Sequence, residues 1–277
     1  MTWPWRKAII VGASSGIGAE LAKQLVAGGC RVALVARREA ELAAVAESTT
    51  DDQGSQPRHR SEGLGRPTSA IADSAPDYPK PNAQRPTPLI YPHDVTCYEE
   101  VPSLFQRICR DLDGLDLIVY SAGYLPRVNE DEYSFEKDRV ALEVNLLGAV
   151  AWLDQAADRF GRAGAGTIVG ISSVAGDRGR KGNPVYNASK AGLNTYLEAL
   201  RMRLQPKGVT VLTAKPGFVT TPMTEGLGKL PMAITAPEAA RRILEAARDK
   251  RSVAYIPSRW RPIMFLIRNL PARLVPK

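Results

Sequence analysis

Residues 7–18 read KAIIVGASSGIG, an apolar run that leads into a loop with three glycines. The run Ala8–Val11 is short and uncharged, as expected of a strand that is buried on both faces. Gly12, Gly16 and Gly18 have a spacing that lets the backbone turn tightly and approach a pyrophosphate. A helix that begins in this loop would point its free N–H groups at the phosphates. The segment therefore predicts a strand–loop–helix unit that binds a dinucleotide.

Similar apolar runs recur along the chain and alternate with helical patterns. The expected strands are Ala8–Val11, Val32–Val35, Leu117–Tyr120, Thr167–Ile171, Val209–Ala214 and, more weakly, Leu89–Tyr91. The expected helices are Ile17–Ala27, Glu39–Glu47, Glu99–Asp111, Phe135–Phe160, Val185–Gln205 and Pro237–Arg248. Buried strands that alternate with helices predict a doubly wound α/β fold, a mostly parallel Rossmann-type sheet with helices on both faces.

The chain has two segments outside this alternation. Residues 48–88 hold seven prolines and no Phe or Trp, and are expected to form a flexible surface insertion in a single catalytic domain that spans residues 1–255. Residues 256–277 form a basic tail. Residues 241–277 contain ten of the 37 Lys and Arg but two of the 29 Asp and Glu, so the rest of the chain carries 27 of each.

Composition narrows the class of protein. A 44% hydrophobic and 24% charged chain of 277 residues is typical of globular proteins. The charge is local and accompanies no nucleic-acid-binding module, so binding to nucleic acid is not expected. The three cysteines lack metal-ligand spacing, so neither a metal site nor a disulfide framework is predicted. Without a recognisable leader or spanning segment, we expect a cytoplasmic protein.

The end of the second strand indicates which dinucleotide is preferred. Ala36 stands about where an NAD-binding fold places a carboxylate on the ribose 2′-hydroxyl, and Arg37 and Arg38 follow it. A guanidinium offers a planar fork to a 2′-phosphate, so NADP(H) is favoured over NAD(H). The alternative is that both arginines are solvated residues of the next helix.

A second group of residues indicates proton transfer. Tyr186 and Lys190 are four residues apart in a predicted helix and therefore share a face. A phenol has a pKa of about 10, and a nearby ammonium would lower it toward the range useful for acid–base catalysis. Ser173 comes 13 residues before Tyr186, at the end of a strand, where its hydroxyl could hold a carbonyl oxygen. Ser172 is a competing hydroxyl.

In this combination and order, the motifs resemble the short-chain dehydrogenase/reductase family over most of residues 7–222. The residues that carry the resemblance are Gly12, Gly16, Gly18, Asp94, Val95, Ser121, Ala122, Gly123, Asn145, Ser173, Tyr186, Lys190, Pro216, Gly217, Phe218, Val219, Thr220 and Thr221. Two positions depart from the usual pattern: Val11 replaces a common Thr, and Tyr120-Ser121 replaces a common Asn-Asn. Both lie near the expected cofactor.

The resemblance implies roles for these residues. Tyr186 would be the proton donor in reduction, Ser173 would orient the substrate carbonyl, and Lys190 would lower the Tyr186 pKa and hold the nicotinamide ribose. Asn145 would anchor a water relay behind Lys190. The implied cofactor-binding set is Gly12, Ser14, Ser15, Gly16, Ile17, Gly18, Arg37, Arg38, Asp94, Val95, Ser121, Ala122, Gly123, Tyr186, Lys190, Pro216, Gly217, Val219 and Thr221.

Three further segments bear on substrate and partners. Residues 177–183 place three cations at the expected pocket mouth, where they would meet an anionic group or form a solvated turn. Residues 222–235 are expected to form a mobile lid with an apolar inner surface. The tail from residue 256 mixes Arg with aromatic and aliphatic residues, which suits either a membrane interface or docking on the protein's own body or on a sister subunit. Loop and tail together resemble, more weakly, a branch of the family with polyprenylphosphoryl keto-sugar reductases.

The leading hypothesis is an NADPH-dependent reductase of a ketone or aldehyde on an apolar or lipid-linked molecule. One alternative is a non-catalytic dinucleotide-binding redox sensor, and another is a nucleotide-sugar epimerase or dehydratase. The resemblance also implies a homodimer or homotetramer. Contacts between subunits, or alternatively packing within one subunit, would account for the apolar positions Leu142, Leu146, Val150, Leu193 and Leu197.

Overall fold

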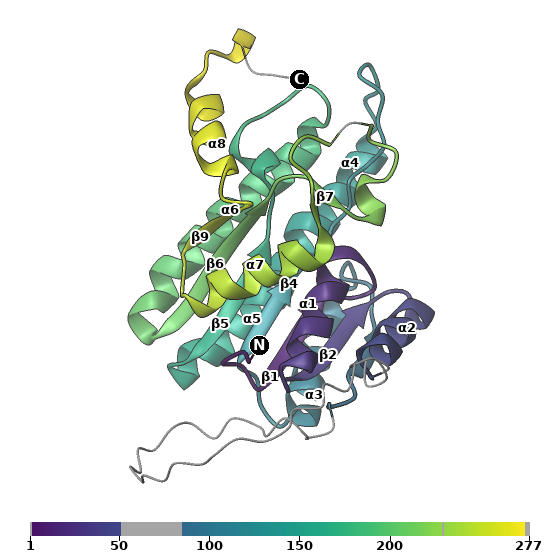
Figure 1. The fold of residues 1–277 in the computed structure, drawn as a ribbon, viewed down its shortest axis with the longest axis vertical. Coiled ribbons are helices and arrows are strands. Elements are labelled where there is room, and N and C mark those ends of the chain that lie inside the picture. Colours follow the sequence, from purple (N-terminus) through teal and green to yellow (C-terminus); the bar gives the residue numbers. More distant parts are fainter. Residues whose placement is uncertain (1, 51–84, 229, 275–277) are drawn as a thin grey trace, which may run out of the picture.

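The computed structural model describes residues 2–50, 85–228 and 230–274, and a sheet of seven parallel strands forms its centre (Figure 1). The strands are β1 (Lys7–Val11), β2 (Arg31–Ala36), β3 (Leu89–Pro92), β4 (Leu117–Tyr120), β5 (Gly166–Ile171), β6 (Val209–Pro216) and β9 (Val253–Ile256). Their order across the sheet is β3-β2-β1-β4-β5-β6-β9, and each neighbouring pair is parallel. This confirms the Rossmann-type fold expected from the sequence.

Helices cover both faces of the sheet because consecutive strand residues point to opposite sides. In β1, Ile10 packs into one hydrophobic layer and Ile9 into the other. The first layer is built on α1 (Gly16–Ala27), α2 (Glu39–Thr50) and α7 (Ala236–Arg248), of which α1 and α7 lie side by side (Figure 1). The second layer is built on α3 (Val101–Asp111), α4 (Phe135–Leu142), α5 (Gly148–Ala163) and α6 (Pro184–Leu204).

The order of the strands creates a crevice at the carboxyl ends of the central strands β1 and β4. The chain leaves β1 for β2 on one side, whereas it leaves β4 for β5 on the other. The register places Val11 beside Tyr120, so the loops after both strands start at the same level and diverge. In open α/β sheets, ligands bind in the crevice between such loops.

The expected helix Phe135–Phe160 is wrong as a single regular helix. The π-helical turn Glu143–Leu147 separates α4 from α5, and Asn145 lies within this turn. Such turns occur often at functional sites. The periodicity of apolar residues continues through the interruption, which explains why the sequence reads as one helix.

Other boundaries also differ. Helix α2 continues to Thr50, so the first three residues of the expected insertion are helical, and residues 51–84 lie outside the described part of the chain. Strand β9 was not expected, and it adds a seventh strand beside β6. Its four residues Val253–Ile256 follow two arginines and a lysine closely, which hides the apolar signal.

The C-terminal helix α8 (Trp260–Asn269) docks on the body of the protein through one face. Trp260 and Met264 are buried, and the Trp260 ring meets Phe218 edge-on with 6.0 Å between ring centroids. Phe265 and Leu266 on the same helix are 69% and 65% exposed. No helix in the described ranges is both long and apolar enough to cross a bilayer.

Two of the five leucine and valine residues expected at a subunit interface are buried in the core of this chain instead. Leu193 and Leu197 are fully buried in the layer under α6, so they cannot form a surface for another subunit. Leu146 also packs against this layer while remaining partly exposed. The sequence pattern could not separate these inward positions from outward ones.

Candidate active site

The glycines of the loop after β1 allow three backbone segments to approach one another. Gly12 has φ +88°, and a Cβ there would lie 2.3 Å from the backbone nitrogen of Ala122. A Cβ on Gly18 would lie 2.1 Å from the carbonyl oxygen of Gly12. Neither position admits a side chain, so the loop presents bare backbone to the crevice, as a bound pyrophosphate requires.

Helix α1 begins at this loop and leaves its first N–H groups available. Its N-cap residue Ser15 makes no side-chain capping bond, and the N–H groups of the first turn have no acceptor within the helix. Ser15, Gly16 and Ile17 line the crevice. The positive end of the helix dipole therefore faces the place where the phosphates would bind.

The end of β2 carries cations and no carboxylate. Arg37 and Arg38 both line the crevice beside Ala36. Nη2 of Arg38 donates a 3.1 Å hydrogen bond to Oγ of Ser14, and Nη1 of Arg37 lies 3.7 Å from Oδ2 of Asp94. Although burial would raise the pKa of Asp94, hydrogen bonds from Thr96 and the Arg37 charge lower it overall. Two guanidiniums and a hydroxyl thus lie together at the end of β2, next to the carboxylate of Asp94.

One cavity of about 620 Å³ runs from this loop to the predicted tyrosine. The predicted site residues that line it are Gly12, Ser14, Ser15, Gly16, Ile17, Arg37, Arg38, Val95, Ser121, Ala122, Gly123, Ser173, Tyr186, Lys190, Pro216, Gly217, Val219 and Thr221. Gly18, Asp94 and Asn145 do not line it. Each of them contacts a residue of the lining instead. Gly18 packs on Gly12, Asp94 pairs with Arg37, and Asn145 accepts a hydrogen bond from Tyr124.

The two candidate serines after β5 point to different places. Ser173 and Tyr186 line the cavity together, and the Ser173 hydroxyl acts on the phenol by lowering the pKa of Tyr186. Its Oγ also accepts a 3.0 Å hydrogen bond from the backbone N–H of Ala175. Ser172 is buried, and its Oγ donates to the carbonyl oxygen of Lys190 at 3.2 Å. Ser173 is therefore the serine that can reach a substrate beside the phenol.

Helix α6 positions the tyrosine and the lysine. Asn183 caps the helix by accepting a 3.2 Å hydrogen bond from the Tyr186 N–H, and Pro184 starts the first turn. Nζ of Lys190 lies 5.9 Å from the centroid of the Tyr186 ring and donates to the carbonyl oxygen of Ile171 at 3.0 Å. Both side chains therefore reach the cavity from one helical face.

The pKa shifts at this pair follow from burial. Burial lowers the pKa of Lys190 to about 8, and no described residue forms an ion pair with it. Burial raises the pKa of Tyr186, and the hydrogen bond from Ser173 only partly opposes this. The expected lowering of the Tyr186 pKa is thus wrong for the protein alone, because desolvation outweighs the neighbouring groups. At neutral pH the phenol keeps its proton.

Asn145 is fully buried next to this pair. Its Oδ1 accepts the N–H of Tyr124 at 2.7 Å, and its Nδ2 donates to Oγ of Ser189 at 3.0 Å. Oδ1 of Asn145 and Nζ of Lys190 lie 3.6 and 3.8 Å from the position that a Cβ on Gly123 would take. The amide is therefore adjacent to the lysine and is held in one orientation.

Comparison with known proteins agrees with this arrangement. Residues 6–59 and 79–230 match the family described as short chain dehydrogenase. The chain belongs to the short-chain dehydrogenase family. It is therefore an NAD(P)-dependent oxidoreductase with the catalytic fold of that family.

Relatives of this dehydrogenase are found among bacterial proteins. An uncharacterized oxidoreductase of Myxococcus xanthus is 31% identical over 220 residues, which cover 79% of this chain and 74% of the relative. An uncharacterized oxidoreductase of Mycobacterium tuberculosis is 28% identical over 271 residues, covering 97% and 95%.

Two solved structures share the fold. A short-chain dehydrogenase from Sphingobium yanoikuyae in complex with NADPH has a TM-score of 0.73 at 22% identity, with 98% of each chain covered. A bulky-bulky ketone specific alcohol dehydrogenase from Comamonas testosteroni has a TM-score of 0.72 at 21% identity, covering 98% of this chain and 99% of the other.

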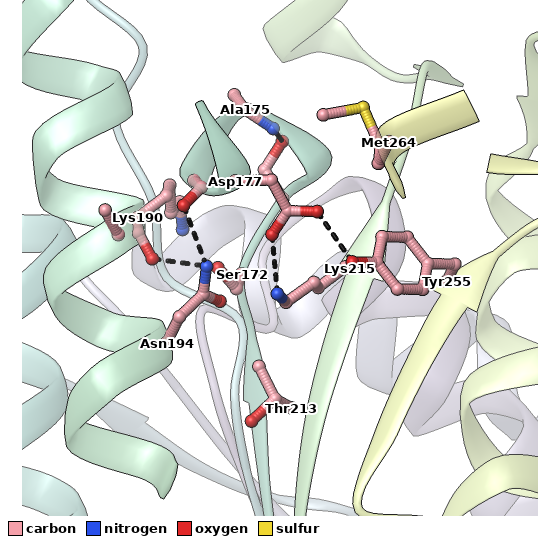
Figure 2. A network of polar contacts seen from close by, with 12 residues as sticks. Ser172, Ala175, Asp177, Lys190, Asn194, Thr213, Lys215, Tyr255 and Met264 are labelled. Carbon is pink, nitrogen blue, oxygen red and sulfur yellow. Dashed lines mark hydrogen bonds and ion pairs between the residues drawn. The ribbon is translucent and has the colours of Figure 1, made fainter. Parts of the chain in front are cut away.

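A buried ion pair that was not anticipated holds the turn after Ser173 in this dehydrogenase (Figure 2). Oδ1 of Asp177 accepts from Nζ of Lys215 on β6 at 2.6 Å, and Oδ2 accepts from the Tyr255 hydroxyl on β9 at 2.7 Å. Nδ2 of Asn194 on α6 also donates to the carbonyl oxygen of Gly176 at 3.1 Å. The only sequence signal was a lysine within the apolar strand β6.

Part of the cavity wall is apolar. It includes Leu125, Val140, Val144, Phe218, Met223 and Leu227. Met223 and Leu227 come from the segment between the short paired strands β7 (Val219–Thr220) and β8 (Ile234–Thr235), where a lid was expected. Nη2 of Arg127 donates to the carbonyl oxygen of Met223 at 3.5 Å. The sequence predicted the apolar character of this segment. It did not predict that Leu125, Val140 and Val144 line the same cavity.

Proposed function

We propose that this dehydrogenase is an NADPH-dependent reductase that converts a ketone or aldehyde into an alcohol, with Tyr186 as the proton donor. The observation that carries the proposal is that Ser173, Tyr186 and the buried Lys190 line the same cavity as the glycine loop. The apolar residues in the wall of this cavity favour a substrate with a large apolar part.

The residues divide the work as follows. A bound nicotinamide supplies the hydride that reaches the carbonyl carbon. Ser173 donates a hydrogen bond to the carbonyl oxygen and holds it near the phenol. Tyr186, which burial keeps protonated, transfers its proton to that oxygen and completes the alcohol. The Lys190 ammonium stabilises the phenolate that remains, and Asn145 anchors the route by which the proton is replaced.

The choice of NADPH rests on the end of β2. Arg37 and Arg38 line the cavity, and Arg38 already contacts the hydroxyl of Ser14. Ala36 offers no carboxylate to repel a 2′-phosphate. A forked guanidinium suits a phosphate, whereas an NAD-binding fold holds the 2′-hydroxyl with a carboxylate at the position that Ala36 takes here.

The test is a panel of ketones and aldehydes assayed separately with NADPH and NADH. We expect consumption of NADPH with bulky apolar carbonyl compounds and a much higher kcat/KM with NADPH than with NADH. Arg37→Glu should reverse this ratio, whereas Glu39→Gln in the next helix serves as a control that should leave it unchanged. A preference of the wild type for NADH would refute the role of Arg37.

The same assays address the other candidate functions. A redox sensor would bind NADPH but consume none with any carbonyl compound. An epimerase or dehydratase of nucleotide sugars would retain its dinucleotide through the reaction rather than exchange it. Free exchange with net oxidation of NADPH supports the reductase.

We also propose that α8 brings the enzyme to the inner face of an anionic membrane. Phe265 and Leu266 are exposed on this helix, and Arg261 and Arg268 are exposed beside them. Apolar and basic residues in this arrangement suit a lipid interface. The double variant Phe265→Ser/Leu266→Ser should reduce cosedimentation with phosphatidylglycerol vesicles, whereas Met202→Ser, at an equally exposed apolar residue on α6, should not. Equal sedimentation of all three proteins would refute this.

A homodimer or homotetramer remains part of the proposal. The outward faces of α5 and α6 are available for it, and Met202 is 70% exposed there. Analytical ultracentrifugation of the full chain tests this, because a monomer at micromolar concentration would contradict it.

A further inference from the structure

Besides Arg37, Arg38 and Lys190, a fourth cation lines the catalytic cavity. Arg180 follows the turn that Asp177 anchors, and it lines the cavity together with Ser173 and Tyr186. Its side chain is half-buried, and its Nε is buried without a hydrogen-bond partner. Its Nη2 contacts only the thioether of Met264, at 3.8 Å. A guanidinium has five N–H donors in a fixed fork, and among the described residues Met264 is the one acceptor found for them.

The charge of Arg180 is not balanced within the described part of the chain. The carboxylate that acts on it, Asp177, already accepts hydrogen bonds from Lys215 and Tyr255. No described residue forms an ion pair with Arg180. Burial lowers the pKa of its guanidinium, which reports the cost of keeping this charge away from water. An anion that entered the cavity would offset that cost.

A hydrogen bond from the catalytic helix fixes the backbone of Arg180. Nδ2 of Asn187, on the catalytic helix α6, donates to the carbonyl oxygen of Arg180 at 3.2 Å. The other two cations of the loop lie elsewhere: Arg178 donates to the carbonyl oxygen of Leu270 at 3.2 Å, and Lys181 is exposed outside the cavity lining. The expected group of three cations is thus reduced to one residue that can touch a substrate.

We propose that Arg180 binds an anionic oxygen group, a carboxylate or a phosphate, on the carbonyl substrate of this enzyme. The proposal rests on the reductase function above and narrows its substrate class to ketones or aldehydes that carry such a group beside an apolar part. A forked guanidinium binds either oxyanion with two hydrogen bonds. With one end held by Arg180, the carbonyl is oriented toward Ser173 and Tyr186.

The test compares three ketones that share one apolar chain and differ at its end, which is a carboxylate, a phosphate monoester or a neutral methyl ester. We expect the wild type to reduce at least one anionic compound with a kcat/KM about 10- to 100-fold above that of the ester. Arg180→Met should remove this preference while leaving reduction of the ester and the Kd for NADPH unchanged. Arg180→Lys should keep part of it.

The control is Lys181→Met, which removes the same charge from the next residue outside the cavity. It should retain the preference, because attraction at a distance is not enough for bidentate binding. Equal kcat/KM for all three ketones in the wild type, or equal loss in both methionine variants, would overturn the inference while leaving the reductase function intact. If none of a broad carbonyl panel consumed NADPH, the function and this inference would both fail. If Arg180→Met did not fold, the wild-type ratio and Arg180→Lys would decide.

Discussion

The ion pair between Asp177 and Lys215 connects the stability of the protein to the geometry of its active site. Asp177 ends the turn that begins after Ser173, and Lys215 precedes Pro216 in β6. The exposed fractions of the Lys215 and Asp177 side chains are 10% and 2%, and Nζ and Oδ1 are 2.6 Å apart. The substitution Asp177→Asn keeps the shape of the side chain but leaves the lysine charge buried without its partner.

The expected cost follows from this burial. Removing one member of a buried pair lowers the free energy of unfolding by about 3–5 kcal/mol, because the other charge stays desolvated. For a domain of this size, that corresponds to a fall in Tm of about 6–20 °C. The double variant Asp177→Asn/Lys215→Met removes both charges, so we expect it to be more stable than Asp177→Asn alone.

Calorimetry and urea unfolding of the two variants measure this effect. The matched control is Asp154→Asn, because Oδ1 of Asp154 accepts a 2.8 Å hydrogen bond from Tyr196 at the surface and faces no buried lysine. We expect that control to cost under about 1 kcal/mol. A cost for Asp177→Asn as small as that of the control, or a double variant no more stable than Asp177→Asn, would refute the reasoning.

Three further variants or conditions test other parts of the site. Gly12→Ala should abolish NADPH binding as measured by fluorescence titration, because its Cβ would meet the Ala122 backbone at 2.3 Å; retained affinity would contradict the close approach. Ser173→Ala should lower kcat/KM by about 10- to 1,000-fold, whereas Ser172→Ala should mainly lower Tm; the reverse result would exchange the two roles. In a pH profile of reduction, kcat/KM should fall as pH rises through about 8, where Lys190 loses its proton. Because the folded-state pKa of Lys190 lies below its ordinary value of 10.5, the same group should make stability rise with pH between about 8 and 10.5, and Lys190→Met should remove both effects.

The sequence predicted the fold well where local pattern and burial agree. The strands β1, β2 and β4 are uninterrupted apolar runs, and they were located to within two residues. It failed for β9, which is short and follows charged residues, and for the π-helical turn that interrupts the helix at Asn145. Strand β9 is recognisable through its pairing with β6, and the π-helical turn is flanked by helix on both sides, so neither has a distinct local pattern in the sequence.

The site was predictable through its glycines and through the spacing of Ser173, Tyr186 and Lys190. The apolar part of the cavity wall could not be predicted, because its residues come from separate segments of the chain and share no regular spacing. The direction of the Tyr186 pKa was also missed, since a sequence shows a neighbouring lysine but not the burial of both groups. Arg180 could be noticed among three loop cations, and only the structure shows that it alone lines the cavity.

The most direct test of the account is single-turnover reduction by Tyr186→Phe, measured by stopped flow with saturating NADPH and a carbonyl substrate of the wild type. The phenyl ring preserves the cavity but has no proton to give. We predict that the variant binds NADPH with the wild-type Kd and oxidises it about 100- to 10,000-fold more slowly. Oxidation at the wild-type rate would contradict the assignment of Tyr186 as the proton donor.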